Sequence, residues 1–550
     1  MKMKTIKQIT FMAIFSFIAL SCEQDAIMLL DPVAVAPSTP SGSAGGADFT
    51  KFSAIGGSYT AGFMHGALYT DGQNNSLAKI IANQINYTRS ADAQATYTFN
   101  QPDINSDNGF SGAGPDGNPG TADDLGRVYL GTSAATGETG VYYKPGDISV
   151  FAPYAGDKTA LNNFSFGNSV MGMFLSGAAG GPAVAVNPVY NSYFARFCAD
   201  CGVASPLAQM MGTAPSFFMA WLGHSDFFAY AARGGDVAQV PKPSGAVLTA
   251  YFESGINAMV GGNPIWKGIV GTVPDVLALP FFNLVPYNPV PMDAATATAA
   301  NAGFASFNGI LTGASGAGLL TTAEAAARQL VFAAGANALV INDSSLTNLL
   351  PVWTALVPAI IPPDDLNANG IPDAIEQLAP FRFARMATST DKPLLSAQPV
   401  IGTAGPYPTT VIGVSWPMDD QYILTGAELL EFETERATLN AGIKAKVAAA
   451  NAAVALNTAG VFDRVAIAEF DGAYAAMAAS SPWSDNGVVV TYDFIPPTGM
   501  WSVDAVHPNK RGYVQLANKW IDAINAHFGS SIPKAQTGWY APPPLPAREP

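Results

Sequence analysis

Residues at two ends of the chain could together carry out nucleophilic chemistry. Ser58 lies in the stretch Gly56-Gly-Ser-Tyr-Thr-Ala-Gly62, where flanking glycines let the backbone approach a bound group closely. A serine at a tight turn after a buried strand is a typical position for a nucleophile, although a purely structural turn fits the same pattern. Asp504 lies three residues before His507, so its carboxylate can orient that imidazole as a general base for Ser58.

The chain contains only four histidines, which narrows the choice of base. His527 falls in the last turn of a predicted helix, where the helix dipole accounts for a histidine. His65 follows Ser58 by seven residues and borders the same site, but no carboxylate lies beside it in sequence. His224 is open to two interpretations, an oxyanion donor or a structural loop residue. His507 is therefore the predicted base.

Hydrophobic periodicity predicts the elements that must position these residues. Continuous or β-prone apolar runs predict strands at 51–56, 161–167, 215–223, 268–276, 338–341 and 464–470. Helical spacing predicts helices at 76–86, 249–260, 294–311, 321–334, 428–454 and 508–528, the last opening at Pro508 and ending before Gly529. The tripeptide His224-Ser-Asp226 follows the carboxyl end of a predicted strand. Open α/β sheets build their sites at such positions.

Composition excludes several classes of protein. With 49% hydrophobic and 12% charged residues, the 550-residue chain is far from the disordered class and can bury a large core. The net charge is −15, and lysine and arginine form no cluster beyond the first few residues. Because phosphate binding needs a basic surface, nucleic acid is excluded as a partner. No internal repeat of fixed period is present.

The first 22 residues predict a lipoprotein signal peptide. Lysines in the first seven residues precede an apolar run at 9–20 that is too short to span a bilayer comfortably. Ile18-Ala-Leu-Ser-Cys22 resembles a bacterial lipobox, in which Cys22 is acylated and becomes the mature N-terminus; an ordinary secretory signal is the alternative. The prediction is a lipid anchor in the outer membrane, facing the periplasm or, as the acidic Glu23-Gln-Asp25 suggests, the cell surface.

The rest of the chain is predicted to form one large domain between two irregular ends. Residues 23–49 are a predicted flexible tether, 50–533 the folded domain and 534–550 a proline-rich tail. A proline-rich, irregular region at about 342–416 is a predicted insertion in that domain.

Cys198 and Cys201 are spaced Cys-Ala-Asp-Cys. In an exported protein this spacing favours a local disulfide. A zinc site would need two further ligands, and the flanking residues do not resemble a thioredoxin-like active site.

One segment predicts a structural calcium ion. Oxygen-bearing residues in the twelve residues 365–376 follow the spacing of calcium-binding loops, with glycine at the sixth position. A polar Asx-type turn without an ion is the alternative. The predicted ligands are the side chains of Asp365, Asn367, Asn369, Asp373 and Glu376 and the carbonyl of Ile371. No cofactor is predicted for catalysis itself.

Together these motifs resemble the SGNH/GDSL hydrolase family over about residues 50 to 535. The stretch around Ser58 is similar to its nucleophile block, Gly167 to its second-block glycine and Gly223-His-Ser-Asp226 to its Gly-x-Asn-Asp block. Asp504-Ala-Val-His507 is similar to its Asp-x-x-His block. Segments flanking these blocks look like those of large, surface-anchored lipoprotein members.

The resemblance implies a three-layer α/β/α sandwich with a mostly parallel, flavodoxin-like sheet. It also implies a triad of Ser58, His507 and Asp504, with the oxyanion held by the N–H groups of Ser58 and Gly167 and by the side chain at Ser225. The chain departs from the family pattern at two of its positions. Gly57 replaces the usual Asp, and Ser225 replaces the usual Asn, whose amide reaches further than a hydroxyl. Losing one oxyanion donor can lower turnover about a hundred- to a thousandfold.

The predicted function is hydrolysis of a carboxylic ester, in a lipid or an acylated glycan, through an acyl-enzyme. The alternative is a catalytically impaired lipoprotein that keeps the fold to bind a lipid or glycan. A third hypothesis is a structural partner of an outer-membrane barrel protein. The sequence leaves all three open.

Overall fold

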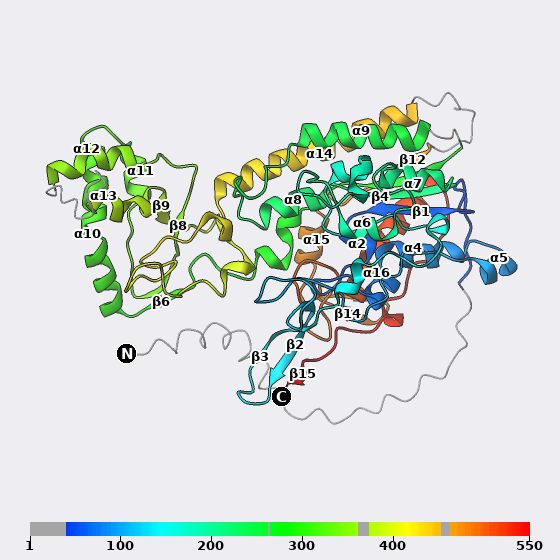
Figure 1. The fold of residues 1–550 in the computed structure, drawn as a ribbon, viewed down its shortest axis with the longest axis horizontal. Coiled ribbons are helices and arrows are strands. Elements are labelled where there is room, and N and C mark those ends of the chain that lie inside the picture. The colour runs from blue at the N-terminus through cyan, green and yellow to red at the C-terminus, as the bar shows by residue number, and fades with distance from the viewer. Residues whose placement is uncertain (1–39, 262–264, 361–372, 453–462, 550) are drawn as a thin grey trace. The chain divides into compact units, whose positions relative to one another are not determined.

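The computed structural model describes residues 40–261, 265–360, 373–452 and 463–549 (Figure 1). The predicted signal peptide with Cys22 and most of the predicted calcium loop lie outside these residues. Contacts within the chain divide it into two compact units. None of the helices in the described residues is long and apolar enough to cross a membrane. The larger unit comprises Pro40–Tyr230, Lys242–Phe281 and Glu431–Pro550, and the smaller includes Ala231–Pro241 and Phe282–Leu430.

A four-stranded parallel sheet forms the centre of the larger unit. Its strands, in spatial order, are β1 (Phe52–Gly56), β4 (Phe217–Trp221), β5 (Lys267–Gly271) and β12 (Val465–Ala468). All four were predicted from continuous apolar runs, and β1 and β4 are buried throughout. The chain is therefore an α/β protein.

The predicted strand at 161–167 forms the far neighbour of β1. Ala54 donates its N–H to the Asn162 carbonyl and accepts from the Phe164 N–H, both at 2.8 Å, and Phe166 donates to the Gly56 carbonyl at 3.1 Å. These are the bonds of a short parallel pairing. Because β4 pairs with the other edge of β1, three parallel segments end side by side at 56, 166 and 221.

Helices pack against the sheet through large side chains. Helix α16 (Lys510–Phe528) places Trp520 5.6 Å from Trp221 and Phe528 5.5 Å from Phe217, between ring centroids. It ends at Gly529 as predicted, with φ at 61°. It begins at Lys510 and not at Pro508. Asn509 is the N-cap, and its side chain accepts hydrogen bonds from the N–H groups of Arg511 and Gly512.

Two long helices of the larger unit run side by side (Figure 1). These are α9 (Gly245–Gly261) and α14 (Gly426–Ala452), whose residues from Glu431 onward belong to this unit. A Cβ atom on Gly442 would lie 2.2 Å from Thr249 Oγ1, so glycine is what allows the close approach.

The remaining helices of the larger unit are short, and its remaining strands lie outside the central sheet. The helices are α2 (Ser58–Ala61), α3 (Thr70–Asn74), α4 (Leu77–Asn86), α5 (Ala91–Thr96), α6 (Ser192–Phe197), α7 (Pro206–Gly212), α8 (His224–Ala231) and α15 (Ala473–Ala479). The strands are β2 (Leu125–Ser133), β3 (Thr139–Pro145), β13 (Trp483–Asp485), β14 (Val488–Val490) and β15 (Ala547–Glu549).

The smaller unit contains helices and two-stranded ribbons around its own apolar core. Its helices are α10 (Ala294–Gly316), α11 (Thr322–Ala327), α12 (Leu350–Ile360) and α13 (Asp373–Leu378). Its strands are β6 (Val290–Met292), β7 (Gly335–Asn337), β8 (Val340–Asn342), β9 (Ala384–Met386), β10 (Lys392–Pro393) and β11 (Ile423–Leu424). The predicted strand at 338–341 is β8, which pairs with β9 and not with the central sheet. The predicted insertion at 342–416 lies inside this unit.

The predicted helix at 321–334 ends early, as α11. Leu330 and Phe332 donate their N–H groups to the side-chain oxygens of Asn308 and Asn301 on α10, at 2.9 and 2.8 Å. The chain therefore turns to follow α10 instead of continuing as a helix.

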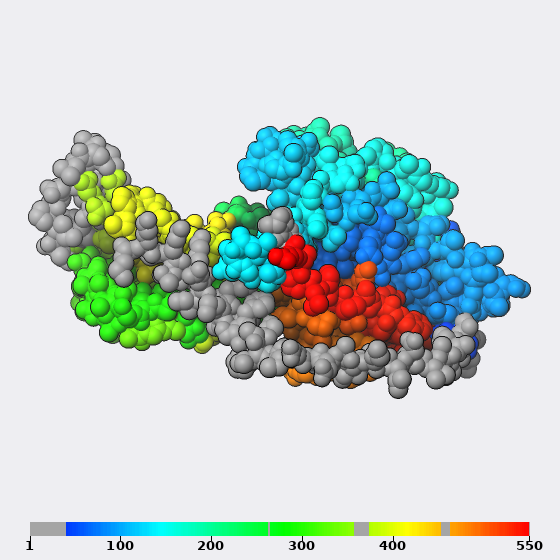
Figure 2. Space-filling view, turned by 90° about the horizontal axis from the view of Figure 1, so that it is seen from below, coloured from blue at the N-terminus to red at the C-terminus, as the bar shows by residue number. Residues whose placement is uncertain are grey.

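The folded body extends beyond both of its predicted limits. Within the predicted tether, Gly46 donates to the Phe528 carbonyl at 2.7 Å and Phe49 is 3% exposed. Within the predicted tail, β15 pairs in parallel with β2, and Figure 2 shows the red C-terminal residues beside a cyan segment. Residues 40–49 and 534–549 are thus part of the fold, because these irregular segments gain backbone partners that composition does not reveal.

Gly271, the last residue of β5, tests how closely the sheet and α16 are packed. A Cβ atom there would lie 2.6 Å from Trp221 Cδ1 and 2.8 Å from Trp520 Cζ2. We expect Gly271→Ala to lower the free energy of unfolding by about 1–3 kcal/mol, because overpacking forces side chains out of their rotamers. Gly212→Ala is the control, since no atom lies within 4 Å of its added carbon. Equal urea midpoints for the two variants would contradict the expectation.

Candidate active site

Ser58 lies at the junction of β1 and α2. Gly56 ends the strand, Gly57 caps the helix without a side-chain hydrogen bond, and Ser58 is the first helical residue. Gly62, at φ 95°, ends α2 by donating its N–H to the Ser58 carbonyl at 2.9 Å. The Ser58 N–H has no acceptor among the described residues, as expected for the first turn of a helix. The predicted strand and the turn after it are thus confirmed, and Ser58 on that turn is half-buried.

Gly167 follows the segment that pairs with the other edge of β1. A Cβ atom at this position would lie 2.2 Å from the Phe63 ring, so only glycine fits. Its carbonyl accepts from Asn191 Nδ2 at 3.0 Å, while its N–H donates to none of the described residues. Two backbone donors without an acceptor in the described part of the chain, at Ser58 and Gly167, therefore lie at the ends of neighbouring parallel segments.

Asp504 and His507 form a hydrogen-bonded pair. His507 Nδ1 lies 2.8 Å from Asp504 Oδ2, and the backbone turn between them includes Ala505 at φ 61°. Asp504 Oδ1 accepts from Ser502 Oγ at 2.8 Å and from the N–H groups of Val506 and His507 at 2.9 and 2.8 Å. Burial alone would raise the pKa of Asp504, but His507 and these donors outweigh burial and hold it well below its usual value.

Two aromatic rings hold His507 at the Ser58 turn. The Tyr59 ring meets the imidazole edge-on at 5.6 Å between centroids, and the Phe63 ring lies at the same distance. Tyr59 also donates its hydroxyl to the Val506 carbonyl at 2.8 Å. The structure thus brings together residues 449 positions apart (507 − 58). Ser58 Oγ and His507 are not hydrogen-bonded to each other in the described chain; such bonds often tighten only when substrate binds.

The start of α8 faces the same turn. A Cβ atom on Gly57 would lie 2.8 Å from Ser225 Oγ and 3.0 Å from His224 Nε2. The two positions that depart from the family pattern, Gly57 and Ser225, are therefore spatial neighbours. Asp226 does not face Gly57: its carboxylate accepts from the Met171 N–H at 3.0 and 3.1 Å, and burial raises its pKa to about 7.

His65 supports the Asp504 turn and is not a second base. Its N–H donates to Ser502 Oγ at 2.9 Å, and its Nδ1 accepts from the Val503 N–H at 3.3 Å. Burial lowers the pKa of His65 to about 4, against the opposing charge of Asp504. Ser502 is the residue that sequence reasoning missed, because a serine two positions before an aspartate carries no signal of this role.

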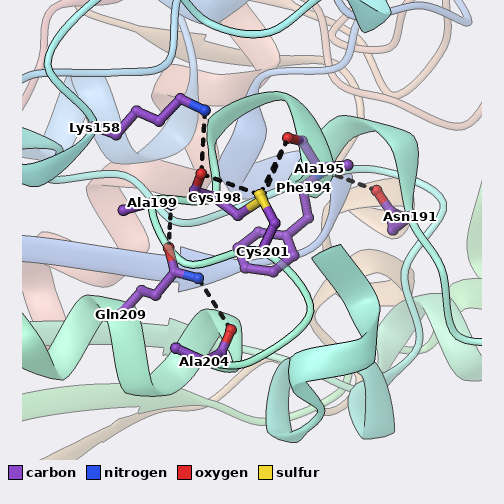
Figure 3. Close-up of a disulfide and its surroundings, with 9 residues drawn as sticks. All are labelled: Lys158, Asn191, Phe194, Ala195, Cys198, Ala199, Cys201, Ala204 and Gln209. Carbon is purple, nitrogen blue, oxygen red and sulfur yellow. Dashed lines mark hydrogen bonds between the residues drawn. A yellow bond between two sulfur atoms is a disulfide. The ribbon is translucent and has the colours of Figure 1, made fainter. Parts of the chain in front are cut away.

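The two cysteines form the predicted local disulfide (Figure 3). Cys198 directly follows α6, whose N-cap is Asn191. The Asn191 side chain accepts from the Phe194 N–H and donates to the carbonyls of Gly167 and Asn168. Helix α6 therefore joins the disulfide at one end to the Gly167 loop at the other.

The predicted calcium ligands are described only in part. Asp373 and Glu376 lie in α13, and the four ligands before them fall outside the described residues. Elsewhere in the described chain, no three His, Cys, Asp or Glu side chains are grouped to hold a metal ion. The calcium ion remains a prediction from sequence.

The chain was compared with models of known families, with curated proteins and with solved structures. No match was found in any of them. The geometry of the site itself combines a hydroxyl on a tight turn, an imidazole paired with a carboxylate, and two N–H groups that have no acceptor among the described residues. Acyl transfer through a serine nucleophile uses this combination of groups.

Ser502 tests how the Asp504 turn is held. Ser502→Ala leaves the buried His65 N–H without its acceptor and removes one donor from Asp504. We expect the free energy of unfolding to fall by about 1–3 kcal/mol. Ser254→Ala, on the exposed face of α9, is a matched control with little expected effect. The expectation fails if urea unfolding gives both variants the wild-type midpoint.

The burial of His224 predicts a dependence of stability on pH. Burial and nearby His507 lower its pKa from 6.5 to about 3, so below pH 6.5 the unfolded chain binds a proton that the folded chain does not. This contribution to stability is complete above pH 6.5 and is lost as the pH falls. Between pH 6 and pH 4.5 the free energy of unfolding of wild type should therefore fall relative to that of His224→Phe. We expect this difference to grow by about 1 kcal/mol for each unit by which the pH is lowered. A stability difference that stays constant in urea titrations across this range would contradict the assignment.

Proposed function

We propose that the larger unit is a serine hydrolase of the SGNH/GDSL type that cleaves carboxylic esters through an acyl-enzyme. One observation carries the proposal: a half-buried Asp504–His507 pair, joined by a 2.8 Å contact between Oδ2 and Nδ1, is held by Tyr59 and Phe63 beside the turn that presents Ser58. In this proposal the parallel sheet is the centre of a flavodoxin-like, three-layer α/β/α sandwich.

The proposed reaction has two halves. Ser58 Oγ attacks the ester carbonyl carbon while His507 Nε2 takes its proton, and the carbonyl oxygen becomes an oxyanion held by the N–H groups of Ser58 and Gly167, with the Ser225 hydroxyl beside them. Collapse of this intermediate breaks the bond to the alcohol, which takes the proton from His507. Water then attacks the acyl-serine by the same route and releases the acid and Ser58.

Asp504 orients the base and stays ionised. Its lowered pKa keeps the carboxylate charged at neutral pH, where it stabilises the imidazolium that forms on His507. Backbone and hydroxyl donors, including the Gly66 N–H, hold the carboxylate in one position. Proton transfer therefore passes through Nε2 of His507.

A row of aromatic rings supports an ester that carries an acyl chain or a sugar ring. From His507 the row runs through Phe63, Tyr193, Phe151 and Phe110, with successive centroids 5.6, 5.3, 5.0 and 5.5 Å apart. Its outer members, Phe110 and Phe151, are partly exposed. Such rings bury apolar groups and stack on sugar faces. We propose a lipid ester or an acylated glycan as substrate.

The cellular setting is also a proposal. Acylation of Cys22 would fix the enzyme to the outer membrane, on its periplasmic or its outer face. Calcium at 365–376 would brace the smaller unit and take no part in the reaction, and a barrel protein of that membrane is the proposed partner.

A binding protein with the same fold is the second candidate. It is favoured by Ser225, which has a shorter reach than the family's amide, and by the missing hydrogen bond between Ser58 and His507 among the described residues. A binding protein has no need of an oxyanion hole.

A fluorophosphonate probe separates the two candidates, because it reacts only with an activated serine. We expect the purified protein, with calcium present, to be labelled, and Ser58→Ala and His507→Ala to lose the label. Asp504→Asn should lower ester turnover about 10⁴-fold, because it favours the wrong tautomer of His507. Ser254→Ala is the matched serine control and should label normally. A folded wild-type protein that takes no label would refute the hydrolase and favour the binding protein.

A further inference from the structure

His224 is a buried polar side chain without a hydrogen-bond partner in the part of the chain that the structure describes. The residue is only 4% exposed, and neither Nδ1 nor Nε2 has a partner among the described residues. A buried donor or acceptor left unpaired costs about 1–3 kcal/mol, so native proteins rarely keep one without a use. The surroundings of the ring indicate what its nitrogens can bind.

The ring of His224 is fixed by packing. It stacks on Tyr59 at 5.0 Å between centroids with an interplanar angle of 21°, and it lies 5.2 Å from the Trp221 ring. Its Nε2 faces Gly57, since a Cβ atom there would come within 3.0 Å of it. Gly57 directly precedes Ser58, so the Nε2 edge of the ring adjoins the backbone that presents the hydroxyl.

Glycine at 57 is what leaves room for this buried edge of the ring beside the Ser58 turn. A side chain on Gly57 would collide with His224 Nε2 and with Ser225 Oγ, at 3.0 and 2.8 Å from its first carbon. The space in front of the imidazole is thus the space that a side chain at 57 would occupy. The position of the His224 ring therefore depends on glycine at 57.

The charge state of His224 suits a donor and not a base. Burial, together with the nearby His507, lowers its pKa to about 3, so the ring is neutral at neutral pH and carries one N–H. None of its described contacts is a carboxylate that could stabilise an imidazolium, because Asp504 is paired with His507. A neutral imidazole can donate a hydrogen bond to a developing oxyanion without giving up its proton.

We infer that Nε2–H of His224 is the side-chain donor of the oxyanion hole, in the place that the family resemblance gives to Ser225. The inference rests on the proposed hydrolase function. The imidazole bonds to the former carbonyl oxygen while the tetrahedral intermediate exists, and no proton is transferred. The backbone N–H groups of Ser58 and Gly167 complete the hole.

Hydrolysis of p-nitrophenyl acetate by the full chain tests the inference. His224→Phe keeps the ring packing but removes the N–H, and we expect kcat to fall about 10²- to 10³-fold with KM little changed. Its free energy of unfolding should stay equal or rise at neutral pH, because the imidazole nitrogens have no partners to lose. His224→Gln keeps a donor and should recover at least tenfold of the loss. Ser225→Ala removes the alternative donor, the Ser225 hydroxyl. Its kcat should fall less than tenfold, on the order of the loss of a weak hydrogen bond.

A second variant tests the same space without touching the donor. Gly57→Ala places a methyl group in front of Nε2, and we expect it to lower kcat at least tenfold, on the order of a displaced oxyanion donor. The same methyl group would lie 2.8 Å from Ser225 Oγ, so this loss together with a loss below tenfold in Ser225→Ala would carry the inference even if His224→Phe failed to fold.

Several outcomes would overturn the inference. The first is a kcat for His224→Phe equal to that of wild type, and the second is an equal fall in kcat for His224→Phe and His224→Gln. The third is a fall in both kcat and the free energy of unfolding of His224→Phe, which would assign the ring a structural role. If wild type hydrolyses the ester and takes the fluorophosphonate label, and His224→Phe is equally active, only this inference is refuted and the hydrolase stands. A wild type that does neither would refute the hydrolase and the inference together.

Discussion

The parallel pairing of β1 with its two neighbours fixes the geometry of the candidate site. Gly56 lies opposite Trp221 in the β1–β4 register, and Phe166 donates to the Gly56 carbonyl on the other edge. Because parallel strands end at the same edge of a sheet, the three turns that follow converge. A slip of one residue in either pairing would turn the side chains of that strand to the opposite face and separate these turns.

The base reaches this edge by a different route. Helix α16 packs Trp520 against Trp221, and the turn before the helix then lies beside α2. Burying the Asp504 carboxylate there has a desolvation cost. Backbone N–H groups, the Ser502 hydroxyl and the imidazole offset that cost, which is why Asp504 remains charged although its side chain is largely removed from water. The same donors restrict His507 to one orientation, so stability of the turn and orientation of the base share one set of bonds.

The sequence predicts features that depend on neighbouring residues better than features that depend on contacts between distant ones. The strands β1, β4, β5 and β12 were predicted because buried parallel strands are continuous apolar runs. Asp504 and His507 were predicted because three residues of separation suffice to pair them on a turn. Ser502 was missed and the limits of the folded body were misplaced, because each depends on a partner hundreds of residues away, as Gly46 does on Phe528. Residue type and spacing carry no record of such partners.

Gly57 and Ser225 show why departures from a family pattern should be interpreted together in space. Taken singly, each removes a feature and suggests a weakened site. In the structure both adjoin His224, a buried imidazole that a side chain at 57 would obstruct. A larger residue at 57 and the His224 ring in its present position exclude each other sterically. In the proposed hydrolase the two departures are explained together by one exchange of donor, an imidazole for an amide, which is consistent with an imidazole that has no partner among the described residues.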